Sequence, residues 1–214
     1  MTMTRLGRIF LTIASVFAGT LGFAGAAERP VPVVTVDAGE IARLEAYLNG
    51  LRTVQARFIQ VASDGSYSEG ALSLSRPGRM RIDYDAPVPI EIVANRGSIV
   101  YHDKKLEQVS YIDTDSTPAG FLLSDRVSFA DKVRVVAYEK AASAIRISLV
   151  RDDDPAAGSL TLVFADQPLE LKKWVVTDAQ GIVTTVSLIA TRFGAAVDSA
   201  LFEFTNPYIG KRSE

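Results

Sequence analysis

The sequence predicts a mainly β protein in which about eleven antiparallel strands form one sheet and helices cover it. Short apolar or alternating segments recur from residue 56 to residue 190, and a short turn separates most of them. Connections this short suit antiparallel neighbours, because a parallel crossover needs a dozen or more residues. No linker or change of composition interrupts this part of the sequence, so we expect a single domain.

Five of these strands lie between Glu69 and Val109 and are separated by turn-forming residues. Pro77-Gly78 and Arg96-Gly97 mark two of the reversals, since Pro presets φ and Gly accepts positive φ. We predict the five strands at Gly70–Ser75, Arg79–Tyr84, Ile90–Asn95, Ser98–Tyr101 and Leu106–Val109. Asp64-Gly65 is typical of a hairpin, which joins a strand at Ala56–Ala62 to one that begins at Tyr67 and includes the first of the five. The other predicted strands are Val133–Tyr138, Ala144–Val150, Ser159–Phe164, Leu169–Thr177 and Ile182–Ala190.

Two helices are expected outside the strands. Ile41, Leu44, Leu48 and Leu51 recur at helical spacing after Asp37 or Ala38, and Asn49-Gly50 weakens the end of that helix. Further on, Thr117 is a candidate N-cap for a short helix with Pro118 in its first turn. That second helix would project the apolar residues Phe121, Leu122 and Leu123. From the residues alone, both helices fit ordinary core packing as well as any special role.

The first 26 residues predict a cleavable signal peptide, which leaves residues 27–214 as the exported domain. Arg5 and Arg8 precede the apolar run Ile9–Gly22, and small residues at Ala24-Gly25-Ala26 suit a cleavage site. The alternative is a retained membrane anchor, but the run is short for a span of about 20 residues. Residues Glu28–Val36 alternate Pro and Val and predict an extended linker.

Composition excludes several classes of function. Hydrophobic residues make up 48% of the 214-residue chain and charged residues 22%, which is typical of a globular protein. The net charge of −2, without a dense Lys/Arg run, argues against a nucleic-acid partner. The chain has no Cys, so disulfides, thiol nucleophiles, thiolate metal sites and an acylated N-terminal cysteine are all excluded.

No catalytic constellation can be assembled from the sequence. His102 is the one histidine, and its place beside a hairpin tip predicts a solvated imidazole. Asp152-Asp153-Asp154 precedes Pro155 in a turn and is expected to be a solvated loop rather than a metal site. No Gly-x-Ser-x-Gly elbow or Gly-rich phosphate loop is present. We therefore expect that the protein is not an enzyme and that it binds no cofactor or metal. A large sheet of this kind either fills its inside with side chains or leaves a cavity for an apolar ligand.

Several segments, taken in order, resemble the periplasmic outer-membrane lipoprotein carrier (LolA) family. The matching segments are Leu51–Gln60 (LRTVQARFIQ), Gly70–Gly78 (GALSLSRPG), Arg81–Pro87 (RIDYDAP), Ile99–Asp103, Leu106–Val109, Thr117-Pro118 with Leu122-Leu123, and Phe202–Pro207 (FEFTNP). The resemblance implies an incomplete antiparallel β-barrel whose helical lid encloses a hydrophobic cavity for lipoprotein acyl chains. It also implies a monomeric periplasmic carrier that receives lipoproteins from an inner-membrane ABC transporter and delivers them to an outer-membrane receptor or the outer membrane. Ile82 and Val100 depart from the family, which often has Trp at the first position and an aromatic residue at the second. The absence of Cys favours this soluble carrier over the related receptor, which is itself a lipoprotein.

Candidate site residues follow from this picture. We expect the cavity wall to include Phe58, Leu72, Leu74, Tyr84, Ile92 and Val93, although strand alternation allows only part of this set to face inward. Phe121, Leu122 and Leu123, together with the helix at Ile41–Leu51, would cover the opening. Arg76 falls on the arginine that, by the resemblance, ties the lid in the closed form. Two alternatives remain: a periplasmic domain that senses lipid or lipoprotein on the same half-barrel, and a hydrolase acting on lipid or glycan.

Overall fold

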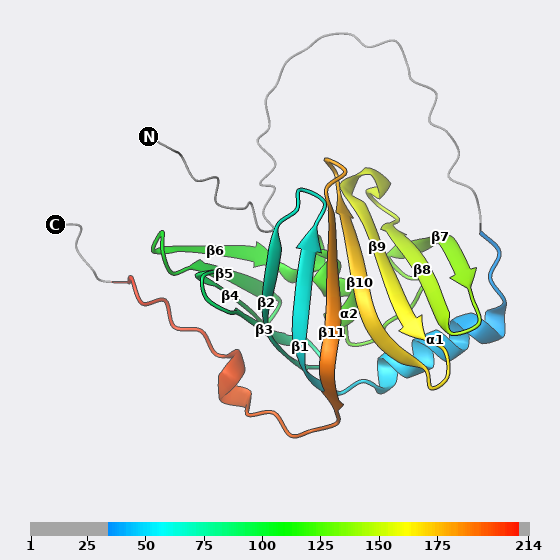
Figure 1. Ribbon diagram of the computed structural model, residues 1–214, viewed down its shortest axis with the longest axis horizontal. Coiled ribbons are helices and arrows are strands. Elements are labelled where there is room, and N and C mark those ends of the chain that lie inside the picture. Colours follow the sequence, from blue (N-terminus) through cyan, green and yellow to red (C-terminus); the bar gives the residue numbers. More distant parts are fainter. Residues whose placement is uncertain (1–33, 210–214) are drawn as a thin grey trace, which may run out of the picture. The chain divides into compact units, whose positions relative to one another are not determined.

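The computed structural model describes residues 34–209, and these residues build one antiparallel sheet of eleven strands with helices against it (Figure 1). The predicted signal peptide lies outside the described residues, as does most of the predicted linker. The strands are β1 Thr53–Ala62, β2 Tyr67–Ser75, β3 Arg79–Tyr84, β4 Ile90–Asn95, β5 Ser98–Asp103, β6 Gln108–Asp113, β7 Val133–Lys140, β8 Ala144–Arg151, β9 Gly158–Ala165, β10 Glu170–Asp178 and β11 Val183–Phe193. The helices are α1 Ala38–Gly50 and α2 Pro118–Leu123, with 3₁₀ turns η1 Thr114–Ser116, η2 Pro155–Ala157 and η3 Ser199–Phe202.

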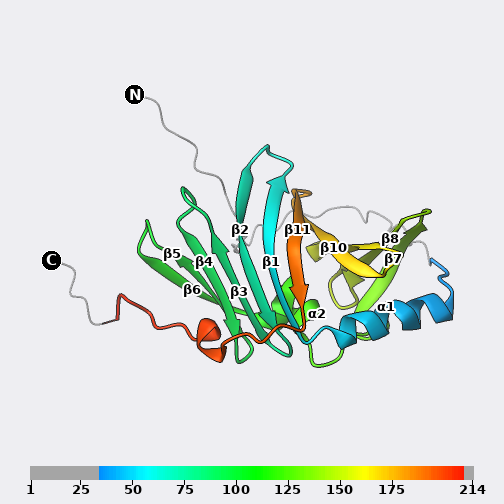
Figure 2. The same ribbon diagram turned by 60° about the horizontal axis from the view of Figure 1, so that its bottom comes forward.

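The strand order shows how two meanders combine into a sheet that does not close. It runs β6-β5-β4-β3-β2-β1-β11-β10-β9-β8-β7, so β1 and β11 join the two meanders and β6 and β7 form the edges. The chain passes from one edge to the other through η1 and α2. Figure 2 shows the strands curving around the helices rather than lying flat. The predicted mainly β, antiparallel and incomplete barrel is thus confirmed.

The predicted strands all occur, with boundaries that differ from the predicted ones by up to four residues, and one predicted cap is corrected. The strand expected at Leu106–Val109 is β6, and it begins only at Gln108. Leu106 lies in the preceding turn because the Asp103 carboxylate accepts hydrogen bonds from the backbone N–H groups of Lys105 and Leu106, each at 2.9 Å. Thr117 does precede α2, but its side chain makes no cap; the hydroxyl donates instead to the Thr114 carbonyl at 2.9 Å.

The two faces of the sheet carry different side chains, because successive strand residues alternate between them. The face that packs against α1 and α2, here called the inner face, bears the apolar core. From α1 this core includes Leu44 and Leu48, and from α2 it includes Leu123. Asp37 caps the start of α1 by accepting a hydrogen bond from the Glu40 N–H at 3.0 Å. Among residues 34–209, no helix is long and apolar enough to cross a membrane.

His102 is buried, so the expectation of a solvated imidazole is wrong. Only 6% of the residue is exposed, and it lies on the outer face, in β5. Its Nε2 is 2.9 Å from the Tyr208 hydroxyl and its Nδ1 is 3.4 Å from Glu91 Oε2. The ring also packs edge-on against Phe204 at 5.4 Å. The C-terminal segment after β11 therefore covers the outer face at this histidine, whereas Asp152-Asp153-Asp154 is exposed.

Gly70 provides a sharp test of packing on the inner face. It pairs directly with Phe58 on β1 and Tyr84 on β3, whose rings meet edge-to-face at 5.2 Å. A Cβ at Gly70 would lie 2.2 Å from the Asp83 carbonyl oxygen and 2.6 Å from the Phe58 ring. The glycine therefore makes room for the Phe58 ring.

We expect Gly70→Ala to lower the free energy of unfolding by about 2–3 kcal/mol, because backbone and ring must both shift. Gly50→Ala is the matched control, since a Cβ there meets nothing within 4 Å. The control should change stability by less than about 1 kcal/mol, in the stabilising direction. Urea unfolding of both variants measures the difference. Equal midpoints would contradict the crowding at Gly70.

Candidate functional site

The strand register shows which predicted wall residues share the inner face. Phe58 pairs with Gly70, Leu72 with Ile82, and Leu74 with Met80, and all of these positions alternate onto the side facing the helices. The inner face thus contains Phe58, Leu72, Leu74, Tyr84 and Ile92, which belong to the core cluster or pack against it. Val93 is the exception.

Val93 lies on the outer face because it follows Ile92 directly in β4. It pairs with Arg81 and Val100, both also on the outer face. Val93 and Val100 line a small depression of about 180 Å³ beside the C-terminal segment, together with Phe202 and Phe204. Val100 therefore lies on the outer face, whereas Ile82 lies on the inner face.

The inner face is filled by the protein's own side chains in this conformation. Leu48 of α1 is 1% exposed and Leu123 of α2 is 2% exposed. Val127 and Phe129, in the loop after α2, are equally buried and belong to the same cluster. The ring of Phe129 stacks on that of Phe121 at 5.7 Å, with an interplanar angle of 21°. Phe121 and Leu122 are half-buried beside this cluster. Residues 118–129, here called the lid segment, thus occupy part of the apolar surface that a ligand would need.

Arg76, in the turn between β2 and β3, binds the ends of both helices at once. One guanidinium nitrogen donates to the Leu48 carbonyl, and the other donates to the Ser124 carbonyl at 2.8 Å. These carbonyls lie at the C-terminal ends of α1 and α2, where the helix dipole places partial negative charge, and the Leu48 carbonyl also accepts the Leu51 N–H at 3.3 Å. The neighbouring Gly78 N–H also reaches the lid segment, donating to the Leu123 carbonyl at 2.8 Å.

The environment of this guanidinium is unusual for a charged group. Arg76 is 9% exposed, and within residues 34–209 no carboxylate lies within 4.0 Å of it. Its Nε is buried and has no hydrogen-bond partner. Burial lowers the pKa of Arg76, the nearby charge of Arg52 lowers it further, and Asp125 partly opposes both. A buried cation held only by neutral acceptors is a contact with a substantial desolvation cost.

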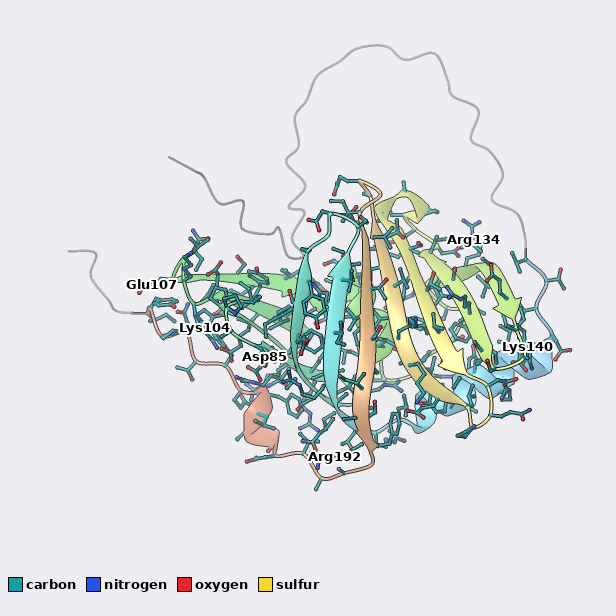
Figure 3. The ribbon with its side chains drawn as sticks, viewed as in Figure 1. Asp85, Lys104, Glu107, Arg134, Lys140 and Arg192 are labelled. Carbon is teal, nitrogen blue, oxygen red and sulfur yellow. The ribbon has the colours of Figure 1, made fainter. Side chains whose placement is uncertain are left out.

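The first helix is fastened to the sheet at its other end. Arg43 donates to Glu40 at 2.7 Å and to Asp166, in the turn after β9, at 2.6 Å. Lys140, at the end of β7 next to α1, approaches Glu40 to 3.4 Å (Figure 3). The hydrogen bond from Arg43 holds the pKa of Glu40 below its usual range. Tyr47 accepts a hydrogen bond from the Leu171 N–H at 2.9 Å, which fixes the C-terminal half of α1 to β10.

Sequence reasoning missed two residues of α1 that hold the lid segment. Asn49 donates from Nδ2 to the Val127 carbonyl and accepts from the Val127 N–H at Oδ1, each at 2.8 Å. Glu45 Oε1 accepts from the Phe129 N–H at 2.7 Å. The sequence offered one faint signal, the alternation of Val127 and Phe129 after Leu123, and no signal for the partners on α1.

A second depression, of about 470 Å³, opens at the surface beside the C-terminal half of α1. None of the predicted wall residues lines it, nor does Phe121, Leu122 or Leu123, whereas four of its lining residues belong to the predicted covering helix at Ile41–Leu51. Its lining residues are Ala46, Tyr47, Gly50, Leu51, Pro168, Leu169, Glu170 and Phe193.

The chain is similar in sequence to known proteins. The sequence profile described as "Outer membrane lipoprotein carrier protein LolA" matches residues 49–205. An outer-membrane lipoprotein carrier protein from Methylococcus capsulatus is 30% identical over 174 residues, which cover 77% of this chain and 83% of that protein. One from Azotobacter vinelandii is 29% identical over 212 residues, which cover 95% and 96% of the two chains. Among solved structures, a LolA superfamily protein from Nitrosomonas europaea has a TM-score of 0.47 and 10% identity, covering 79% of this chain and 99% of that one. Since the profile spans most of the sequence, from the end of α1 to beyond η3, the chain belongs to the outer membrane lipoprotein carrier protein LolA family.

Proposed function

We propose that this protein is an exported, monomeric periplasmic carrier that shelters the acyl chains of lipoproteins between the inner face and the lid segment. It receives a lipoprotein from an inner-membrane ABC transporter and delivers it to an outer-membrane receptor or to the outer membrane. Membership of a lipoprotein carrier family supports the cargo. No bond is made or broken in this action.

The single observation that carries the proposal is the Arg76 contact with both helix ends. The inner face is apolar, yet it is covered by a segment whose attachment includes a costly buried cation. When the lid segment moves away, the guanidinium can recover its hydration, and this gain offsets part of the cost of uncovering the apolar face. A lid held in this way exchanges with a ligand more readily than a well-packed core element.

The proposed ligand contacts follow from the register. Phe58, Leu72, Leu74, Tyr84 and Ile92 form the wall, and Phe121, Leu122 and Leu123 form the cover. Burial of acyl chains contributes about 0.8 kcal/mol per CH₂ group, so retention is strong and release requires a receiving site of higher affinity. Contacts of this kind are non-directional, which suits a carrier that accepts many lipoproteins.

The direct test is native mass spectrometry of the protein recovered from the periplasm of cells that produce lipoproteins. We expect a population whose added mass equals that of an acylated lipoprotein. Protein from cells in which lipoprotein acylation is blocked is the control and should lack this population. Recovery of only the free protein, while lipoprotein transfer proceeds normally, would contradict the carrier function.

Arg76→Leu should impair delivery more than folding. Removing a buried, unpaired charge offsets the loss of two hydrogen bonds, so we expect the melting temperature to change by less than about 4 °C. The two helix ends would lose the contact that fixes their closed geometry, so the lid segment should return to that geometry less often, lipoprotein should stay bound longer and its transfer should slow by about fivefold or more. Pull-down of the exported protein with lipoprotein detection, alongside thermal melting, measures both effects.

The control for this variant is Arg96→Leu, because the Arg96 side chain is 80% exposed and only reaches Glu203 at 3.4 Å. It should leave melting and transfer unchanged. If Arg76→Leu lowered transfer only in proportion to its loss of stability, the arginine would have a structural role alone.

A further inference from the structure

The lid segment is held from two directions. Arg76 and Gly78 hold Ser124 and Leu123 from the sheet, as described above. The loop that follows is held from α1, through the two bonds between Asn49 and Val127 and the bond from Phe129 to Glu45. Asn49 satisfies both the donor and the acceptor of one buried residue, so its side chain replaces a strand partner for Val127.

The contacts of α1 with the sheet are separate from its contacts with the lid segment. Arg43 and Tyr47 bind Asp166 and Leu171, in the turn after β9 and at the start of β10. The ring of Tyr47 also packs edge-on against Phe164 of β9 at 5.9 Å. None of these three contacts involves residues 118–129. The helix can therefore remain seated while the lid segment leaves it.

We propose that Asn49 and Glu45 are positioning residues that form a second latch, independent of Arg76, and that the lid segment lifts from a stationary α1. Opening then requires the bonds to Val127 and Phe129 to break, while the bonds of Arg43 and Tyr47 persist. The effect that we expect on ligand binding rests on the proposed carrier function. The latch itself does not, because it concerns the free protein.

If these bonds form a latch, weakening them changes the apparent affinity for a ligand, which loss of a purely structural contact would not do. A ligand that binds only the open form has an apparent dissociation constant equal to the intrinsic value divided by the open fraction. Weakening the latch raises the open fraction, so a variant that is less stable when free should bind its ligand more tightly. An ordinary destabilising substitution acts on the open and closed forms alike and leaves affinity unchanged.

The first experiment is amide hydrogen exchange on the free full-length protein, comparing wild type with Asn49→Leu. We expect the N–H groups of Phe129 and Gly78 to exchange about tenfold faster, because both bonds join the lid segment to the rest of the protein and neither involves Asn49. The N–H of Leu171, which binds Tyr47, should keep its wild-type rate and so report a stationary α1. Faster exchange at Val127 alone would show only a local bond and would overturn the latch. Equal acceleration at Leu171 would overturn the stationary helix.

The second experiment measures binding of a synthetic triacylated lipopeptide. Asn49→Leu should tighten the apparent affinity by roughly tenfold while lowering the melting temperature. Tyr47→Phe is the matched control on the same helix, because it removes one hydrogen bond to β10 and none to the lid segment. It should lower the melting temperature and leave affinity unchanged. Unchanged or weaker binding by a folded Asn49→Leu would contradict the latch.

Glu45 provides a second variant pair should Asn49→Leu not fold. Glu45→Gln keeps an acceptor for the Phe129 N–H and should resemble wild type in both experiments. Glu45→Leu removes the acceptor and should accelerate exchange at Gly78 and tighten lipopeptide binding. Identical behaviour of the two variants would overturn the role of Glu45. If wild type binds no lipopeptide, the carrier function fails, and the exchange experiment still decides the latch.

Discussion

The closed form depends on one buried guanidinium placed between two helix ends. Arg76 meets the Leu48 and Ser124 carbonyls, each at the C-terminal end of a helix, where the helix dipole favours a cation. This attraction opposes the desolvation of a charge that has no carboxylate partner and one unpaired N–H. The attraction to the helix ends favours the contact, and the desolvation of the charge disfavours it. The result is a contact that specifies geometry strongly while contributing little net stability, which is what a reversible closure requires.

The topology explains why one arginine can reach both helices. Antiparallel pairing sets Thr53, at the start of β1, beside Ser75, at the end of β2. The turn that carries Arg76 therefore adjoins the connection from α1 to β1, and the Arg76 N–H donates to the Arg52 carbonyl there at 2.8 Å. The lid segment arrives at the same place because it spans from β6 to β7, the two edges of the unclosed sheet. The segment that crosses between the two edges of the sheet is thus held at the turn between β2 and β3.

Much of this fold could be predicted from the sequence, and the failures share a cause. Alternation and turn residues located eleven strands, and the helical spacing of Ile41 to Leu51 located α1, which spans Ala38–Gly50. The pattern also showed that Ile92 and Val93 oppose each other, but it could not say which faces inward, since both are apolar. His102 was placed wrongly because the residue that covers it, Tyr208, is 106 positions away. Asn49 looked like a helix end, and its partner Val127 is 78 positions away. Local patterns specify elements, whereas burial and side-chain bonding depend on which distant segments meet.

In the function proposed above, closure and cargo binding compete for the same apolar surface. In water an uncovered inner face would cost free energy in proportion to its area, so the empty protein needs a cover of its own. Leu48, Leu123 and Phe129 supply that cover, and under the proposed function they bury area that acyl chains would bury in the open form. The binding free energy for cargo is therefore the difference between burying the inner face under acyl chains and burying it under the protein's own side chains. The hydrogen bonds that hold the lid segment closed reduce it further. Few hydrogen bonds would leave the cover loose and the cargo hard to release, and many would exclude cargo altogether. A small set of separate bonds, from Arg76, Asn49 and Glu45, stabilises the closed form enough to favour release of cargo but not so much that cargo cannot bind.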